Sequence, residues 1–130
     1  MKFLSKTVLA VTALVVASSP LSAAEVKPFD AVTFAAAQKA GRPILVDVKA
    51  WWCPVCASQN ATIRDTVSAA TYKNVLILEV NYDKQQDVWQ GLGVNKQGTL
   101  IAYRGGKELQ RLQFVTDKVQ INTLLGRLAS

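Results

Sequence analysis

Short apolar segments rich in β-branched residues alternate with helical segments along most of the chain. The apolar runs have the length of strands, and turn-forming residues separate them from patterns with helical spacing. The predicted order is helix, strand, helix, strand, helix, strand, strand and helix, over 29–40, 44–48, 54–70, 75–82, 83–92, 99–103, 109–114 and 117–128. This alternation predicts an α/β fold in which helices flank a central mixed sheet, with an antiparallel hairpin at its end.

Local signals mark several helix starts. Asp30, Asp83 and Asp117 stand where a side chain can cap the first turn, and Gln86 and Gln120 follow two of them three residues later. Pro54 stands where the first helical turn tolerates proline, because that N–H would be unpaired in any case. These signals predict helices that begin close to residues 30, 54, 83 and 117.

The first 24 residues have the pattern of a secretory signal peptide. Lys2 and Lys6 precede an uncharged apolar run over 7–17, and Ser22-Ala23-Ala24 supplies small residues before a cut ahead of Glu25. The apolar run is shorter than the roughly 20 residues that span a bilayer, so a cleaved leader is favoured over an uncleaved anchor. The sequence therefore predicts a signal peptide over 1–24, one domain over 25–130 and a location in the periplasm.

The charge pattern is that of an ordinary solubilising surface. The chain has 15 basic and 9 acidic residues, but its basic residues are scattered and form no run with interleaved aromatic side chains. Nucleic acid is therefore not expected as a partner. For a domain of this size we expect a monomer.

The chain contains two cysteines, Cys53 and Cys56, and no histidine. They lie between a predicted strand and a predicted helix, and the N-terminus of a helix favours negative charge. This position lowers the pKa of the Cys53 thiol and so raises the fraction of thiolate, the attacking species in disulfide exchange. Cys56, one helical turn later, can then resolve the mixed disulfide.

Two other uses of the cysteine pair are less favoured. A bridge between cysteines so close together closes almost no loop, so it does little to constrain the unfolded chain. Tetrahedral zinc needs about four nitrogen or sulfur ligands, and covalent haem attachment would need a histidine where Ala57 stands. We therefore predict redox exchange, with no metal and no cofactor.

The segment from Ile44 to Cys56, Ile-Leu-Val-Asp-Val-Lys-Ala-Trp-Trp-Cys-Pro-Val-Cys, closely resembles the active-site segment of the thioredoxin family. Asn81-Tyr82-Asp83, Leu92-Gly93-Val94 and the stretch from Thr99 to Gly106 resemble later parts of the same fold. The resemblance covers essentially all of 25–130. It implies a thioredoxin-like fold and dithiol–disulfide exchange, with Cys53 as nucleophile and Cys56 as resolving thiol.

The resemblance also implies a role for Asp47, which matches the family's buried acid beneath the second cysteine. Burial would raise its pKa, so that Asp47 could accept the proton from Cys56. Where the family carries a lysine that pairs with this acid, the chain has Glu79. Two interpretations remain open: Glu79 repels Asp47 and helps it to hold a proton, or Glu79 faces outward from its strand.

A second departure concerns the loop that faces the cysteines. Gln97-Gly98-Thr99 stands where the family has a cis-proline before threonine, and a cis bond before glycine would cost about 3–4 kcal/mol. We therefore expect a trans bond, a more flexible loop and thiols that are less shielded. The residues predicted to contact a substrate are Trp52, Pro54, Val55, Gln97, Gly98 and Thr99.

The predicted function is thiol–disulfide exchange with protein substrates, with a reductase favoured because Asp47 can help to deprotonate Cys56. A membrane-bound electron donor would then re-reduce the pair. A disulfide oxidase or isomerase is the nearest alternative. A binding module that holds a partner or a metal ion without turnover is the alternative from another class.

Overall fold

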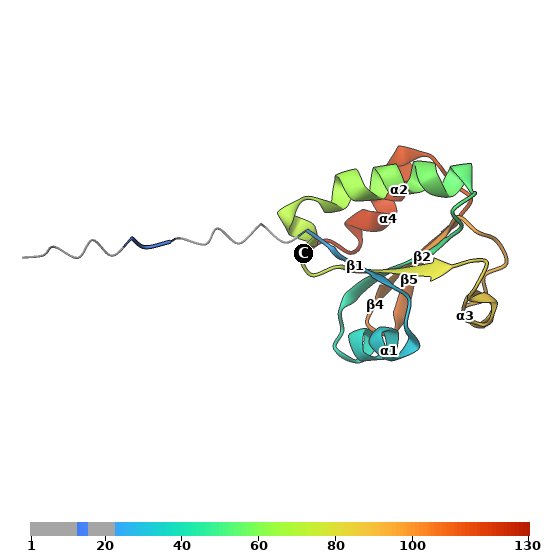
Figure 1. Ribbon diagram of the computed structural model, residues 1–130, viewed down its shortest axis with the longest axis horizontal. Helices are drawn as coiled ribbons and strands as arrows, with labels where there is room; N and C mark the ends of the chain where they lie inside the picture. The colour runs from blue at the N-terminus through green and yellow to red at the C-terminus, as the bar shows by residue number, and fades with distance from the viewer. Residues whose placement is uncertain (1–12, 16–22) are drawn as a thin grey trace, which may run out of the picture.

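The computed structural model describes residues 13–15 and 23–130 (Figure 1). The predicted signal peptide therefore lies, except for 13–15 and 23–24, outside the described residues. The elements are β1 (Glu25–Pro28), α1 (Ala31–Lys39), β2 (Pro43–Lys49), α2 (Pro54–Val67), a 3₁₀ turn η1 (Ala70–Tyr72), β3 (Leu76–Asn81), α3 (Gln86–Gly91), β4 (Thr99–Arg104), β5 (Lys107–Gln113) and α4 (Lys118–Gly126).

The five strands form one mixed sheet in the order β1-β3-β2-β4-β5. β1 and β2 run parallel to β3, while β4 runs antiparallel to β2 and pairs with β5 through the hairpin. β2 is the central strand, and every residue in it except Lys49 is buried. The strand that leads into the cysteine pair is thus the most enclosed strand of the molecule.

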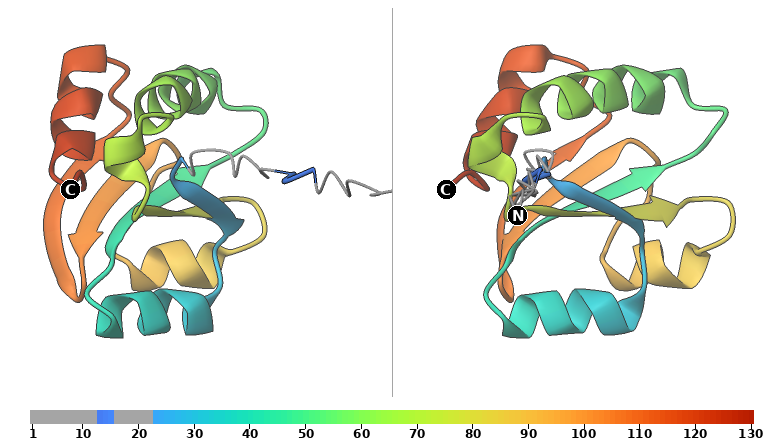
Figure 2. Two further views of the ribbon diagram at one scale, coloured as in Figure 1. Left: turned by 90° about the vertical axis from the view of Figure 1, so that its left-hand side faces the viewer. Right: turned by 60° about the vertical axis from the view of Figure 1, so that its left-hand side comes forward.

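Helices cover both faces of the sheet, as the alternating sequence pattern predicts (Figures 1 and 2). α2 and α4 lie on one face, and α1 and α3 lie on the other. Side chains alternate between the two faces along each strand, so the sheet contributes to two separate cores. Leu45 and Ile77 pack beneath α2 and α4, while Val46 and Leu78 pack on the face covered by α1. In the part of the chain that is described, no helix has both the length and the apolar character needed to cross a bilayer.

Most predicted boundaries are correct to within a few residues. Asp30 and Asp117 cap α1 and α4 as predicted, and their carboxylates accept from the Thr33 and Gln120 backbone N–H at 3.0 and 2.8 Å. Pro54 opens α2. The helix predicted over 54–70 ends at Val67, and η1 takes up the chain that follows.

The structure differs from the predicted elements in two places. β1 was not predicted, because Glu25–Pro28 is a short, largely exposed edge strand with no alternating apolar pattern. The helix predicted from Asp83 begins only at Gln86. The Asn81 side chain instead accepts from the N–H groups of Asp83 and Lys84, both at 3.1 Å, and holds a turn there.

Candidate active site

Cys53 and Cys56 form a disulfide at the N-terminus of α2, with their Cα atoms 5.2 Å apart. Cys53 is the N-cap residue, and its Sγ accepts a hydrogen bond of 3.1 Å from the Cys56 backbone N–H. Sulfur therefore occupies the place where a capping oxygen usually stands, at the positive end of the helix dipole. This arrangement favours negative charge on Cys53 Sγ once the disulfide is reduced.

Both cysteines are well shielded from solvent. Cys53 is 2 % exposed and Cys56 is 3 % exposed, and they pack with Ala50, Val55 and Tyr82. The expectation of less shielded thiols was therefore wrong, because neighbouring side chains cover the pair even without a proline in the facing loop. A shallow hollow of about 180 Å³ nevertheless reaches both cysteines and is lined also by Lys49, Trp51 and Asn60.

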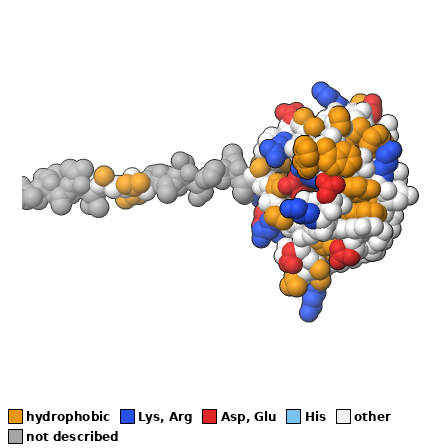
Figure 3. Space-filling model, turned by 45° about the vertical axis from the view of Figure 1, so that its right-hand side comes forward, with side chains coloured by type: hydrophobic (Ala, Val, Ile, Leu, Met, Phe, Trp, Pro, Cys, Tyr) orange, Lys and Arg blue, Asp and Glu red, His pale blue; other side chains and the backbone are white. Residues whose placement is uncertain are grey.

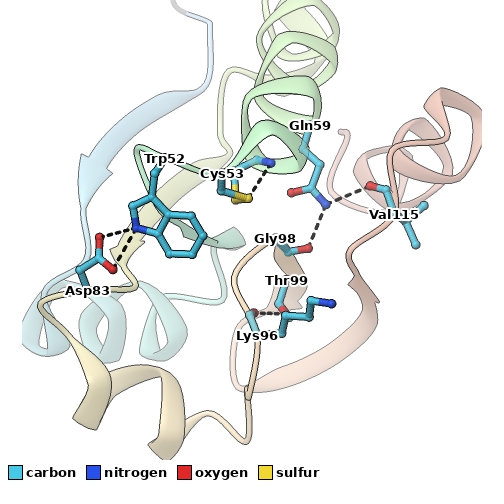
Figure 4. Close-up of a disulfide and its surroundings, with 9 residues drawn as sticks. Trp52, Cys53, Gln59, Asp83, Lys96, Gly98, Thr99 and Val115 are labelled. Carbon is cyan, nitrogen blue, oxygen red and sulfur yellow. Dashed lines mark hydrogen bonds between the residues drawn. A yellow bond between two sulfur atoms is a disulfide. The ribbon is translucent and has the colours of Figure 1, made fainter.

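The two tryptophans before the pair have different surroundings. Trp51 is 91 % exposed, whereas the Trp52 indole packs edge-on against Tyr82 and donates to the Asp83 carboxylate at 3.0 and 3.2 Å (Figure 4). Tyr82 in turn stacks on Trp89, which is buried as predicted. Trp52 is thus held in place beside the disulfide, while Trp51 projects into solvent.

Hydrophobic side chains gather at the surface of this end of the molecule. Figure 3 brings forward the end at which α2 begins, and it shows an apolar area bordered by acidic and basic side chains. A second hollow, of about 300 Å³, lies here between Trp51, Pro28 and Val80, with Lys49 and Glu79 at its border. An apolar area beside a reactive pair is a typical contact surface for a protein partner.

Asp47 lies on β2 and is 3 % exposed. Burial raises the pKa of its carboxyl to about 7, the charge of Glu79 adds to the rise, and the positive charge of Lys49 opposes it. In the parallel register Asp47 is the partner of Glu79 on β3. Asp47 is therefore an acid that gains and loses a proton near neutral pH.

Glu79 fits neither open interpretation completely. It is partly exposed and forms an ion pair with Lys49, two residues after Asp47 on the same strand. Glu79 thus pairs with Lys49 on the same face of the sheet as Asp47, and its charge raises the pKa of Asp47. Lys49 was not among the predicted site residues, because its partner lies on another strand.

The loop before β4 approaches the cysteine pair as predicted, with Gly98 opposite Val55. Among the described residues every peptide bond is trans, which includes the bond before Gly98, and Gly98 has a φ of +77°. Its N–H donates to the Val48 carbonyl oxygen at 2.7 Å, and its carbonyl oxygen accepts from the Phe114 N–H at 2.8 Å. Thr99 is buried, and its hydroxyl donates to the Lys96 carbonyl oxygen at 2.7 Å.

Gln97, next in this loop, is partly buried. Within residues 23–130 its peptide N–H and C=O have no hydrogen-bond partner. Pro54 and Val55 complete the surroundings of the pair on α2. The structure thus brings Val55, which lies between the two cysteines on α2, against Gly98 in the facing loop. The roles of these residues in substrate binding stay predictions.

Sequence reasoning missed Gln59, which is fully buried on the face of α2 that carries Cys56. Its amide nitrogen donates to the carbonyl oxygens of Gly98 and Val115, both at 2.9 Å (Figure 4). A signal was present in the sequence, because helical spacing places Gln59 between Cys56 and Ile63 on the apolar face. A polar residue in such a stripe indicates a buried polar contact.

Residues 13–15 and 23–130 contain no group of three or more His, Cys, Asp or Glu side chains that could hold a metal ion.

Comparison with known proteins agrees with this geometry. The family model described as Thioredoxin matches residues 25–127. The crystal structure of Trxlp from Edwardsiella tarda superimposes with a TM-score of 0.73 and 35 % identity, over 77 % of this chain and 98 % of that one. Curated relatives include a thioredoxin from Chlamydia caviae, 30 % identical over 65 % of this chain and 80 % of its own length. Another is a thioredoxin from Alicyclobacillus acidocaldarius, 27 % identical over 71 % of this chain and 87 % of its own length.

Proposed function

The chain belongs to the thioredoxin family of thiol–disulfide oxidoreductases, and on this premise we propose that it reduces protein disulfides in the periplasm. The observation that carries the redox role is Cys53 Sγ at the N-cap of α2, where it accepts the Cys56 N–H. The leader pattern over 1–24 supports the location. The proposed direction of electron flow, from this protein to its substrate, is argued from Asp47.

The exchange proceeds through a mixed disulfide. In the reduced protein the Cys53 thiolate attacks one sulfur of a substrate disulfide, a Cys53–substrate bond forms, and the other substrate sulfur leaves as a thiolate. Cys56 then attacks Cys53 Sγ, which closes the Cys53–Cys56 disulfide and releases the second substrate sulfur. Two electrons pass from the dithiol to the substrate, and an external dithiol, which we propose to be membrane-bound, must return them.

Asp47 provides a destination for the proton that Cys56 loses. A carboxylate with a pKa of about 7 is half ionised near neutral pH, so it can accept a proton there and release it again. An ordinary carboxylate would be a much weaker base. This supports a reductase, because a reductase must deprotonate Cys56 in every cycle.

The apolar surface around Trp51 and the free peptide group of Gln97 support a protein substrate. Exposed apolar side chains can pack against a partner, and an unpaired N–H and C=O can join an extended segment by main-chain hydrogen bonds. Trp51 lines the hollow that reaches both cysteines, and Gln97 directly precedes Gly98, which lies opposite Val55. We propose that the protein meets its substrates as a monomer.

The decisive experiment is insulin disulfide reduction with dithiothreitol as the electron source. Wild type should accelerate the reaction, and Cys53→Ser should have no activity above the uncatalysed rate. Cys56→Ser is the matched control: it keeps the attacking sulfur but cannot resolve, so the reduced variant, mixed with insulin without dithiothreitol, should accumulate a mixed disulfide that mass spectrometry detects. No acceleration by wild type, or equal rates for wild type and Cys53→Ser, would refute the proposed activity.

The reduction potential of the pair, measured against glutathione, tests the direction. A value near about −270 mV is expected for a reductase. A value near about −120 mV would instead indicate a disulfide oxidase.

A further inference from the structure

Gln59 connects three segments that are distant in the sequence. It stands on α2, one turn after Cys56, and it is fully buried. Its two N–H groups reach the carbonyl oxygen of Gly98, before β4, and that of Val115, between β5 and α4. One side chain therefore ties the helix that carries the cysteines to both loops that face it.

The remaining polar atom of this amide has no partner. Gln59 Oε1 is buried without a hydrogen bond from any described residue, which costs free energy compared with an apolar side chain of the same size. In Figure 4 the oxygen is turned to the side of the disulfide, and the nitrogen is turned to the two carbonyl groups. An apolar side chain would fill this space without leaving a buried oxygen unpaired. The contribution of the Gln59 amide is therefore the two hydrogen bonds that it donates.

The loop that contains Gly98 and leads into β4 (the Gly98 loop) needs an additional restraint, because glycine itself restricts the backbone very little. Apart from the bond from Gln59, Gly98 is held by its N–H to Val48 O at 2.7 Å and by the Phe114 N–H to its carbonyl oxygen at 2.8 Å. A carbonyl oxygen has two lone pairs, so it can accept from both Phe114 and Gln59. A rigid proline ring is absent from this loop, and the Gln59 amide holds the carbonyl group from the opposite side.

We propose that Gln59 is a positioning residue that fixes the Gly98 loop opposite the disulfide and thereby determines the affinity for protein disulfides. This rests on the proposed function, because the loop carries the free peptide group of Gln97 next to Gly98, which lies opposite Val55. An extended protein segment pairs with that group only if the loop keeps its position, since a preorganised site avoids an ordering cost on binding. A small disulfide without a peptide chain does not use the loop.

The variant Gln59→Met tests this proposal, because it preserves length and apolar packing but has no N–H to donate. For insulin, KM should rise about tenfold with little change in kcat. For hydroxyethyl disulfide, kcat/KM should stay within about twofold of wild type. Gln59→Asn retains an amide on a shorter side chain that cannot span both carbonyls, and it should fall between wild type and Gln59→Met.

Thr62→Val is the matched control. Thr62 is buried on the same helix, but its hydroxyl faces only the Ser58 carbonyl oxygen within α2. This variant should retain the wild-type preference between insulin and hydroxyethyl disulfide. If Gln59→Met loses activity equally on both substrates, or on neither, the proposed role in recognition is wrong.

Amide hydrogen exchange separates this inference from the proposed function. The N–H groups of Gly98 and Phe114 should exchange about tenfold faster in Gln59→Met than in wild type, and they should be unchanged in Thr62→Val. This result does not depend on redox activity, so it tests whether Gln59 restrains the Gly98 loop even if wild type fails to reduce insulin. Unchanged exchange at both amides would overturn the proposal, whatever the activities show.

Discussion

Asp47 shows how one side chain acquires its chemistry from its surroundings. The resemblance to the family's buried acid, together with the apolar run around Asp47, predicted burial and a raised pKa. The size of the effect depends on charges from two strands: Glu79 on β3 raises the pKa and Lys49 on β2 lowers it. Because Lys49 pairs with Glu79, the two charges partly cancel at Asp47, and burial remains the largest cause.

Replacement of Asp47 by Asn should stabilise the protein at neutral and alkaline pH. In the folded protein the pKa of Asp47 is raised from 3.8 to about 7, so its contribution to stability is complete in acid and is lost as the pH rises through about 7. Asp47→Asn removes this loss. The free energy of unfolding of the variant should therefore exceed that of wild type by up to about 4 kcal/mol at about pH 8, and the difference should be small at about pH 4. Urea denaturation across this range measures it.

Asp65→Asn, which removes an exposed acid on the surface of α2, is the control for the loss of a carboxylate as such. A stability difference for Asp47→Asn that does not grow with pH would contradict a raised pKa. The same variant should also slow insulin reduction, because Cys56 loses its proton acceptor.

At the scale of elements, the site is the meeting point of a helix start and a loop. α2 begins directly after the central strand, so the cysteines stand at the end of the most enclosed part of the sheet. The loop before β4 reaches the same end because β4 runs antiparallel to β2, with Thr99 opposite Val48. The pairing of these two strands therefore sets the distance between the loop and the disulfide.

Replacement of Gly98 by Ala should destabilise the protein by about 1–2 kcal/mol, because a side chain disfavours the left-handed φ of +77°. The added Cβ would also lie 3.2 Å from the Phe114 ring and 3.4 Å from Val55 Cγ1, so close neighbours must shift. Gly106→Ala is the matched control, since no atom lies within 4 Å of its added Cβ. Similar urea midpoints for the two variants would show that the Gly98 backbone is not restrained in this conformation.

At the scale of the whole molecule, the sheet begins where the predicted leader ends. Glu25 is the first residue of β1, and its N–H donates to the Val75 carbonyl oxygen at 3.0 Å. A cut before Glu25 would therefore remove none of the five strands. The buried residues of both cores lie within 25–130, and Ala24, which the cut would remove, only packs against the border of one of them.

Expression of the full chain in a Gram-negative host should yield a periplasmic protein whose mass corresponds to a start at Glu25. Ala24→Leu places a large residue directly before the cut and should leave the leader attached, because cleavage needs small residues there. Cell fractionation and intact mass spectrometry provide the measurement. Recovery of the uncleaved wild-type chain in the cytoplasm would contradict the proposed location.

The sequence by itself determined the features that depend on neighbouring residues. Apolar periodicity predicted most of the strands and helices. Asp30 and Asp117 were predicted to cap two helices, and Cys53 was predicted to lie at the start of a helix. Each depends on residues within about one helical turn, so a local pattern records it.

Only the tertiary structure decided which distant side chains meet. Gln59 reaches the Gly98 and Val115 carbonyl groups 39 and 56 residues away, and Trp52 reaches Asp83 31 residues away. Lys49 meets Glu79 30 residues away, and the edge strand β1 exists because β3 offers it hydrogen bonds. No local periodicity encodes such contacts, because they form only when strand order and helix packing bring separate segments together.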